Sequence, residues 1–563
     1  MSLSPHEDRG IPTETGRVAR AAFPKTTFCM RLRDVLGPLF TDEAFAGLFS
    51  VRGRPAESPG TLALVSVLQF VEGLTDTQAA DAVRGRVDWK YLLGLELTDQ
   101  GFDSSVLTEF RGRLVESGSA EALLFESVLD RVKAADLLAA GGRTRTDSTH
   151  VLGAIRDLER LELVGETLRA ALEAIAATDP AWLRSFAPKD WFTQYGARVD
   201  AYRLPKAETE RLELARRIGA DGVTVLAQAW RADAPEFVKT LPAVSSLRAI
   251  WVQQYYRDDS GIVLRDKEIH GRPPGAIAIT SPYDLDARYS VKRGAGWNGY
   301  KVQISEGCDD ERPHLITYVD TVPATEADID TTTRVHESLA RRDLVPVEHL
   351  ADSAYVTADT VLDAQARHGI ELVGPVGQGN QWQSRNPGAF DTDAFTIDWD
   401  TLTAVCPQGH RNTWSGTGTD RHGKPRVMFT FSLTDCTPCP VRSRCTRAKT
   451  AARTITLRPR EQHELLRDLR TEQQSEQWRQ RYAARSGIEG TISQAVRAFG
   501  LRRCRYKGVA KARVQNILTA TAINLTRLDA WLAGKPLGRN RVSHPRRHVR
   551  HLDLEGFDCL GRR

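Results

Sequence analysis

The stretch with the clearest chemical potential runs from Tyr482 to Arg497. At helical spacing Tyr482, Arg485 and Glu489 fall on one face, and an apolar stripe lies beside them. A glutamate next to a fixed arginine can hold a metal ion while the arginine meets a phosphate. An ordinary surface ion pair has the same spacing, so the surrounding sequence must decide between the two interpretations.

A basic run follows this stretch and contains no acidic residue. Its members are Arg502, Arg503, Arg505, Lys507, Lys511 and Arg513. A carboxylate followed by a basic run indicates metal chemistry on a polyanion, because clustered cations attract phosphates. We therefore expect this run to contact DNA phosphates close to the active site.

Two aspartates stand where strands of a sheet could bring them to Glu489. Asp147 lies on a predicted strand at 143–151, and Asp352 follows a predicted strand at 347–351. A pair of magnesium ions needs several carboxylates that converge on one point. Asp286 and Asp320 compete for the second position, and the strand order favours Asp352.

The order of the elements predicts the fold of this region. Further strands are expected at 300–305, 315–322 and 370–376, and helices at 328–342 and 357–368. With the strand that carries Asp147, the order is β-β-β-α-β-α-β, followed after an insertion by the Glu489 helix. This order is typical of a ribonuclease-H-like α/β fold, a mixed sheet with helices on both faces.

The remaining segments divide the chain into further parts. Residues 26–142 read as helices, either a DNA-binding domain of the helix-turn-helix kind or a plain bundle. The catalytic domain is assigned to 143–376 and 461–530, with a helical insertion at about 154–256. We expect a flexible lead-in at 1–25 and a basic tail at 531–563.

Four of the eight cysteines lie within 40 residues of one another, in an insertion at 377–460. They are Cys406, Cys436, Cys439 and Cys445, and the Cys-x-x-Cys spacing is that of a zinc knuckle. These thiolates would hold one structural Zn²⁺, with His410 as a substitute ligand. Four reduced thiols without a metal are the alternative.

These motifs resemble the DDE transposases of bacterial insertion sequences over about 30–530. The resemblance is carried by Thr146–Val151, Trp297–Lys301, Ala351–Tyr355 and the Tyr482-x-x-Arg485-x-x-x-Glu489 signature. It implies a helical N-terminal domain that binds element ends, and Mg²⁺-dependent DNA cleavage and strand transfer, with two Mg²⁺ ions or Mn²⁺ in their place.

The same resemblance assigns the site residues and the partners. Asp147, Asp352 and Glu489 would be the catalytic acids and metal ligands, and Tyr482 and Arg485 belong to the signature. A lysine often stands seven residues after the glutamate, where this chain has Val496, so Arg497 or Lys507 would replace it. The implied partner is double-stranded DNA, as terminal inverted repeats and target DNA, bound by a homodimer.

The composition of the chain indicates its protein class and its expected location in the cell. The 563 residues are 41% apolar and 26% charged, with a formal net charge of +5, as in a soluble globular protein. We expect neither a membrane span nor an export signal, and hence a cytoplasmic, nucleoid-associated protein. Two alternatives to a transposase stay open: a nuclease or resolvase without strand transfer, and an inactive DNA-binding derivative.

Overall fold

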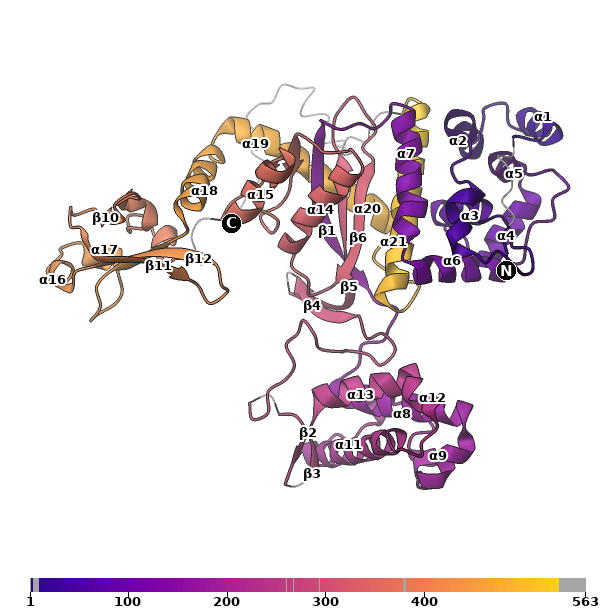
Figure 1. Cartoon of the computed structure of the whole chain (residues 1–563), viewed down its shortest axis with the longest axis horizontal. Helices are drawn as coiled ribbons and strands as arrows, with labels where there is room; N and C mark the ends of the chain where they lie inside the picture. The colour runs from indigo at the N-terminus through magenta and orange to yellow at the C-terminus, as the bar shows by residue number, and fades with distance from the viewer. Residues whose placement is uncertain are drawn as a thin grey trace, which may run out of the picture.

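The computed structural model describes residues 2–3, 10–259, 261–266, 268–292, 294–377 and 381–535. Three parts surround a central sheet (Figure 1). The N-terminal helices lie on one side of it, a helical body lies below it, and a small strand-rich module lies on the opposite side. Residues 536–563 of the predicted basic tail lie outside the described residues. No helix within the described ranges is long and apolar enough to cross a membrane.

The central sheet has six strands in the order β4-β5-β1-β7-β8, and β6 pairs with β5. They are β1 (Arg143–Leu152), β4 (Arg288–Lys292), β5 (Ala295–Gly307), β6 (Ile316–Pro323), β7 (Glu348–Leu350) and β8 (Glu371–Val373). β1 runs antiparallel to β5 and parallel to β7, which in turn runs parallel to β8. β4 was not predicted. The other five strands and the helices between them follow one another along the chain in the predicted order.

Helices cover both faces of this sheet. They are α14 (Ile329–Arg341), α15 (Ala358–His368), α18 (Arg460–Glu472), α19 (Glu476–Ala483), α20 (Gly487–Phe499) and α21 (Val509–Leu532). α20 packs on β1, and α21 lies between β6 and the N-terminal helix α3. Tyr300, Val302 and Ile304 lie buried on one face of β5, and Gln303 and Ser305 are buried on the other, so this strand is covered on both faces. The predicted ribonuclease-H-like fold is confirmed.

The N-terminal region is helical, as expected. Its elements are α1 (Thr13–Ala22), α2 (Phe28–Leu36), η1 (Asp42–Leu48), α3 (Pro59–Glu72), α4 (Asp76–Gly85), α5 (Val87–Leu93), α6 (Ser105–Ser117), η2 (Glu121–Glu126) and α7 (Ser127–Ala134). α1 lies inside the segment for which a flexible lead-in was predicted, and that prediction is wrong there. Buried Thr15 donates to the Leu95 carbonyl and Arg20 to the Tyr91 hydroxyl, so contacts distant in sequence order this helix.

A helical body, defined here as residues 154–286, is inserted between β1 and β4. It contains α8 (Arg160–Thr178), α9 (Pro180–Phe186), α10 (Trp191–Gln194), η3 (Ala201–Arg203), α11 (Glu208–Ala229), α12 (Glu236–Thr240), α13 (Pro242–Gln254), β2 (Tyr255–Asp258) and β3 (Gly261–Leu264). It extends beyond the predicted limit of 256. The β2–β3 hairpin and the buried Ile279 pack into its core, which periodicity within the helices alone does not reveal.

A ribbon module, defined here as residues 381–459, is inserted between β8 and α18. It contains η4 (Gln383–Arg385), η5 (Thr392–Ala394), β9 (Thr396–Asp398), β10 (Thr403–Val405), β11 (Asn412–Thr419), β12 (Pro425–Phe431), α16 (Leu433–Cys436), α17 (Arg442–Cys445) and β13 (Thr454–Leu457). β11, β12 and β13 form an antiparallel sheet, and β9 pairs with β10. The small core contains Phe395, Phe429 and Ile455.

Candidate active site

Three carboxylates converge on the guanidinium of Arg485. Its Nη2 atom lies 2.7 Å from Oδ2 of Asp147 and 3.8 Å from Oδ2 of Asp352. Its Nη1 atom lies 3.1 Å from Oε1 of Glu489. The structure therefore brings together all three acids singled out in the sequence, with the signature arginine between them.

The sheet register explains why the two aspartates meet. In the parallel pair β1–β7, Arg145 stands opposite Leu350. Asp147 and Asp352 each lie two residues further along, so both stay next to each other at the carboxyl end of this strand pair. Glu489 is added from the first turn of α20, which packs on β1.

The helix that carries the signature is interrupted, whereas the sequence predicted one continuous helix. α19 ends at Ala483, and a 3₁₀ turn (Ala484–Ser486) precedes α20. The Nη1 atom of Arg145 donates a 2.7 Å hydrogen bond to the Ala484 carbonyl, which also accepts from the Gly487 N–H within the 3₁₀ turn. A Cβ atom at Gly487 would lie 1.9 Å from Nη1 of Arg145, so a side chain there would displace this guanidinium.

Tyr482 ties the signature to the strand end that precedes Asp352. Its hydroxyl donates a 3.2 Å hydrogen bond to the Ala351 carbonyl. Its ring stacks on Trp478 with centroids 4.7 Å apart. Tyr482 therefore positions the chain next to Asp352 and makes no contact with the carboxylates themselves in the described structure.

Burial and neighbouring charges shift the pKa of Asp147, the least exposed of the three acids. Burial raises the pKa of Asp147, and the nearby charge of Asp352 acts in the same direction, against the lowering effects of Arg485, the Ser148 N–H and Lys292. The exposed fractions of the side chains increase from 13% for Asp147 to 36% for Asp352 and 67% for Glu489. Asp147 is thus the most buried of the three acids, and it is the one closest to the guanidinium.

A cleft of about 520 Å³ opens over Asp147 and Glu489. Its wall combines cationic, aromatic and small side chains: Lys292, Arg497, Arg502, His150, Trp297 and Gly296. The His150 and Trp297 rings lie 5.5 Å apart, and burial together with Arg502 and Lys292 lowers the pKa of His150. The cleft is therefore acidic at its floor and basic at its walls.

The basic run predicted to contact phosphates is spread over several surfaces. Arg502 lies in the cleft and donates to Oγ1 of Thr149, whereas Arg505 lies over the Phe70 ring, 4.6 Å from its centroid. The Lys507 ammonium lies 4.7 Å from the Tyr283 ring centroid. Arg513 pairs with Asp320, and Arg503 and Lys511 are exposed elsewhere.

The competing aspartates lie apart from the acid cluster. Asp320 accepts from Arg513 at 3.3 Å in a different cavity. Asp286 accepts from the Val509 N–H at the start of α21. The position that the family lysine often occupies, Val496, lines the cleft together with Arg497. Arg497 is therefore closer to Glu489 in the structure than Lys507, which contacts the helical body.

The three carboxylates suit divalent magnesium in kind, since hard cations prefer carboxylate oxygens. Within the described residues, however, no group of three or more His, Cys, Asp or Glu side chains is arranged tightly enough to hold a metal ion. Arg485 lies between the carboxylates and holds their oxygens on different edges of its guanidinium. Its Nε atom is buried and has no hydrogen-bond partner in the described chain.

The four clustered cysteines line one small cavity of about 30 Å³ in the ribbon module. Cys406, Cys436, Cys439 and Cys445 are all partly buried and unpaired. Burial raises the pKa of the Cys445 thiol, and the other three sulfurs add to this effect. His410 pairs with Asp435 at 3.7 Å beside them. Thiol donors suit zinc, although they do not form a tight ligand group here.

Two side chains of the site were not identified from the sequence. Lys292 reaches the cleft from β4, a short strand that follows an irregular segment and was not recognised in the sequence. Arg145 supports Ala484 and pairs with the buried Glu306. Its position two residues before Asp147 places it on the same face of β1, and this spacing was the available signal.

Two family models match separate parts of the chain. A model described as "Transposase DDE domain" matches residues 405–529, which include Glu489. A model described as "Transposase domain (DUF772)" matches residues 17–113, within the N-terminal helices. No curated protein matches the chain. Together with the ribonuclease-H-like sheet, these two matches support an insertion-sequence DDE transposase.

Proposed function

We propose that the chain binds the ends of an insertion sequence and catalyses Mg²⁺-dependent DNA cleavage and strand transfer there. The observation that supports this most directly is the convergence of Asp147, Asp352 and Glu489 on Arg485, with Asp147 and Glu489 lining a cleft that also carries Lys292, Arg497 and Arg502. Phosphodiester chemistry needs this combination of acids and cations.

In this proposal the acids hold the metal ions and the cations hold the DNA. Asp147 on the sheet, Asp352 at the adjacent strand end and the exposed Glu489 on α20 would hold Mg²⁺ or Mn²⁺. The metal would supply Lewis-acid activation of the attacking oxygen and charge stabilisation of the leaving oxygen. Arg485 compensates the charge of the three carboxylates.

The cleft walls would position the scissile phosphate. Lys292, Arg497 and Arg502 surround the opening and have no acidic partner within the described residues. Cations in a groove above carboxylates draw a polyanion towards acids that would otherwise repel it. We further propose that two copies of the chain act on one DNA, because strand transfer joins two element ends to one target.

Amide variants of the acids test the proposal. Asp147→Asn, Asp352→Asn and Glu489→Gln should each abolish Mg²⁺-dependent cleavage of element-end DNA while binding persists, because affinity depends on cations elsewhere. Asp320→Asn is the matched control and should cleave normally. Full activity in Asp352→Asn would contradict the assignment.

The reaction products separate transposition from the alternatives. A labelled element end that becomes covalently joined to target DNA supports a transposase. Products that are only nicked or cut would indicate a nuclease or resolvase, and DNA binding without Mg²⁺-dependent products would indicate an inactive derivative.

We also propose one structural Zn²⁺ in the ribbon module, bound by Cys406, Cys436, Cys439 and Cys445. Its support is that one small cavity collects all four thiols, at a place where few apolar side chains are buried. The role would be structural, because four thiolates complete the tetrahedral coordination of Zn²⁺ and leave no open position. Metal analysis of the purified protein tests this assignment.

A further inference from the structure

The ribbon module carries a dense group of positive charge that the cleft does not use. The module contains eleven Lys and Arg and six Asp and Glu. The highest density is in the tip segment, defined here as residues 442–449, with Arg442, Arg444, Arg447 and Lys449 and no acid. The whole chain has a net charge of only +5, so this concentration is local and needs an explanation.

The structure fixes the shape of this tip segment from within. The Nη2 atom of Arg442 donates to the carbonyls of Ala448 and Ala451, each at 3.0 Å, and to that of Lys449 at 3.4 Å. One guanidinium therefore holds the loop that displays Arg447 and Lys449. A loop fixed in this way loses little conformational entropy when it binds a partner.

Aromatic rings, rather than acids, support the other two guanidiniums. Arg447 lies over Trp382 and Arg444 over Phe390, each with 4.5 Å between the guanidinium carbon and the ring centroid. Arg444 also donates to the Gly388 carbonyl. Stacking holds the plane of a guanidinium while its N–H groups stay available to a phosphate.

The basic residues nearer the sheet behave differently. Lys424 pairs with Asp359 of α15 at 3.1 Å, and Arg458 pairs with Asp420 at 3.4 Å. Within the described residues, by contrast, Arg447 and Lys449 are exposed and have no acidic partner. The charges of Lys424 and Arg458 are thus neutralised by acids, whereas those of Arg447 and Lys449 in the tip segment are not.

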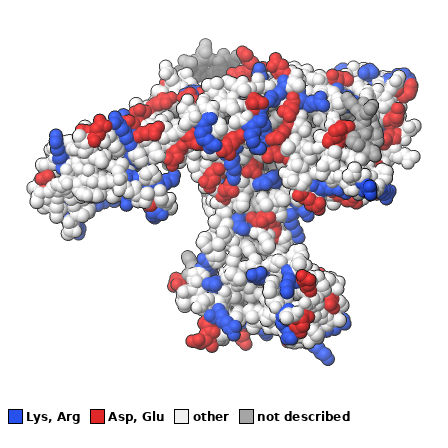
Figure 2. Space-filling view, viewed as in Figure 1, with Lys and Arg blue, Asp and Glu red and all other residues white. Residues whose placement is uncertain are grey.

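We propose that the tip segment binds the phosphate backbone of duplex DNA outside the active-site cleft. This inference rests on the proposed function, since it assumes that the chain acts on DNA. Unpaired, pre-positioned cations without an adjacent base-reading helix suit a sequence-independent contact. The module projects from the sheet on the side opposite to the N-terminal helices (Figure 1), so the contact lies apart from theirs. In the space-filling view, basic side chains lie along the lower edge of this module (Figure 2).

The test uses the full-length double variant R447Q/K449Q and a duplex longer than the element end. Each phosphate contact contributes a slope of about 0.9 to the dependence of log Kobs on log salt concentration. We expect the slope to fall by about two units and the affinity at 0.15 M salt to weaken up to about 30-fold, as two lost counterion-release contacts imply. Cleavage at saturating DNA should stay normal, because neither residue touches the cleft.

The matched control is K424Q/R458Q, which removes the same charge from the same module at ion-paired positions. Its salt slope should equal that of the wild type. An unchanged slope in R447Q/K449Q, or an equal loss in both variants, would overturn the proposal. Failure of the proposed function looks different, because the wild-type protein would then not cleave element-end DNA in the presence of Mg²⁺.

Discussion

The helical body and the ribbon module are both inserted into the same sheet, but different forces hold them together. The helical body has a core of its own that contains Trp191, Trp251 and Tyr255 among 21 buried residues. The core of the ribbon module has seven buried residues, with three of the cysteines at its margin. Apolar burial can therefore stabilise the first insertion alone, whereas the second has a much smaller core, for which the proposed zinc site would provide a cross-link.

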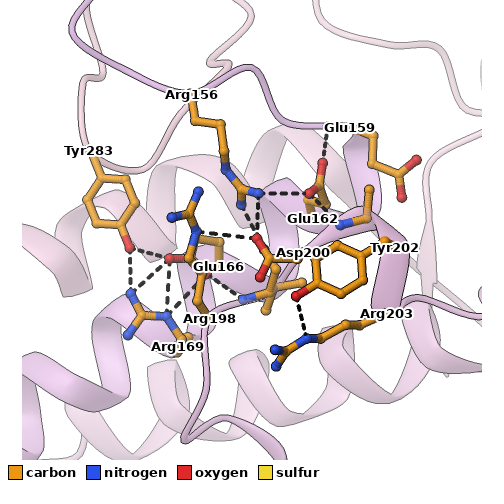
Figure 3. Close-up of polar contacts among 12 residues, drawn as sticks. Arg156, Glu159, Glu162, Glu166, Arg169, Arg198, Asp200, Tyr202, Arg203 and Tyr283 are labelled. Carbon is orange, nitrogen blue, oxygen red and sulfur yellow. Dashed lines mark hydrogen bonds and ion pairs between the residues drawn. The ribbon is translucent and has the colours of Figure 1, made fainter.

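The two insertions also use their charges differently. The helical body contains 18 basic and 20 acidic residues, and many of them pair internally. Glu166 accepts from Arg169, Tyr283 and the Val199 N–H, and Arg156 bridges Glu162 and Asp200 (Figure 3). In the ribbon module, cations are left without acids at the tip. Internal pairing indicates a structural role, and unpaired charge indicates a partner.

The largest expected effect concerns the metal of the ribbon module. Metal binding to thiolates contributes folding free energy of about 10 kcal/mol in structural zinc peptides. Purified protein should contain one zinc per chain, and the double variant Cys436→Ser with Cys439→Ser should lose it. Chelation should expose 400–450 to protease while the helical body stays protected.

Cys504→Ser is the control for this experiment, because Cys504 lies outside the cluster and packs against another core. This variant should keep its zinc. Protein purified without chelator that contains no zinc, yet resists protease over 400–450, would show that the small apolar core suffices and would remove the contrast between the insertions.

The second prediction addresses the core of the helical body. Trp251 is 4% exposed, and its Nε1 donates to the Gly219 carbonyl at 3.0 Å. Replacement of Trp251 by Ala should lower the free energy of unfolding by about 3–5 kcal/mol, because it leaves a cavity and an unpaired carbonyl. Denaturant unfolding measures this loss. A matched change at the exposed Trp230 should have little effect, and equal effects would argue against a packed core.

The third prediction concerns the ion-pair network of the helical body. Burial alone would raise the pKa of Glu166, but hydrogen bonds from Arg169, Tyr283 and Val199 outweigh it and lower the pKa. Glu166→Gln should therefore cost about 1.5–3 kcal/mol at neutral pH, the usual contribution of a charged hydrogen bond. Glu173→Gln, at a 67% exposed partner of the same arginine, should be nearly neutral.

The pH dependence of this difference follows from the lowered pKa. The stabilisation by ionised Glu166 is fully present above the ordinary glutamate pKa of 4.5 and is lost as the pH falls through the lower folded-state pKa. Wild type and Glu166→Gln should thus converge in acid. If the two free energies of unfolding differ by the same amount from pH 7 down to the acid transition, the shape of the Glu166 side chain, and not its charge, stabilises the fold.

The sequence predicted the fold and the acids because both depend on local patterns. The periodicity of apolar residues predicted the order of strands and helices. β1 and β7 are parallel, so Asp147 and Asp352 lie at the same edge of the sheet. The interrupted helix before Glu489 was not predictable from periodicity. It depends on Arg145, which is more than 300 residues away in sequence, and on the close approach of its guanidinium to Gly487.

The sequence also did not predict how the six basic residues of 502–513 are distributed over the surface of the protein. Six cations within 12 residues look equivalent along a chain, but α21 and its preceding loop pass three different surfaces. Phe70 receives Arg505, Tyr283 receives Lys507 and Asp320 receives Arg513. Charge counts over a segment predict attraction to a polyanion, and tertiary contacts decide which of the cations remain available for it.

The smallest expected effect completes the contrast between the insertions. Arg216 and Arg217 are neighbouring exposed residues of α11, and the helical body that carries them is slightly acidic overall. The double variant R216Q/R217Q removes as much charge as R447Q/K449Q does, yet it should leave the salt slope of DNA binding unchanged. Only cations at the phosphate backbone release counterions on binding. A slope reduced by one unit or more, measured by fluorescence anisotropy on the same duplex, would show that the helical body also lies on DNA.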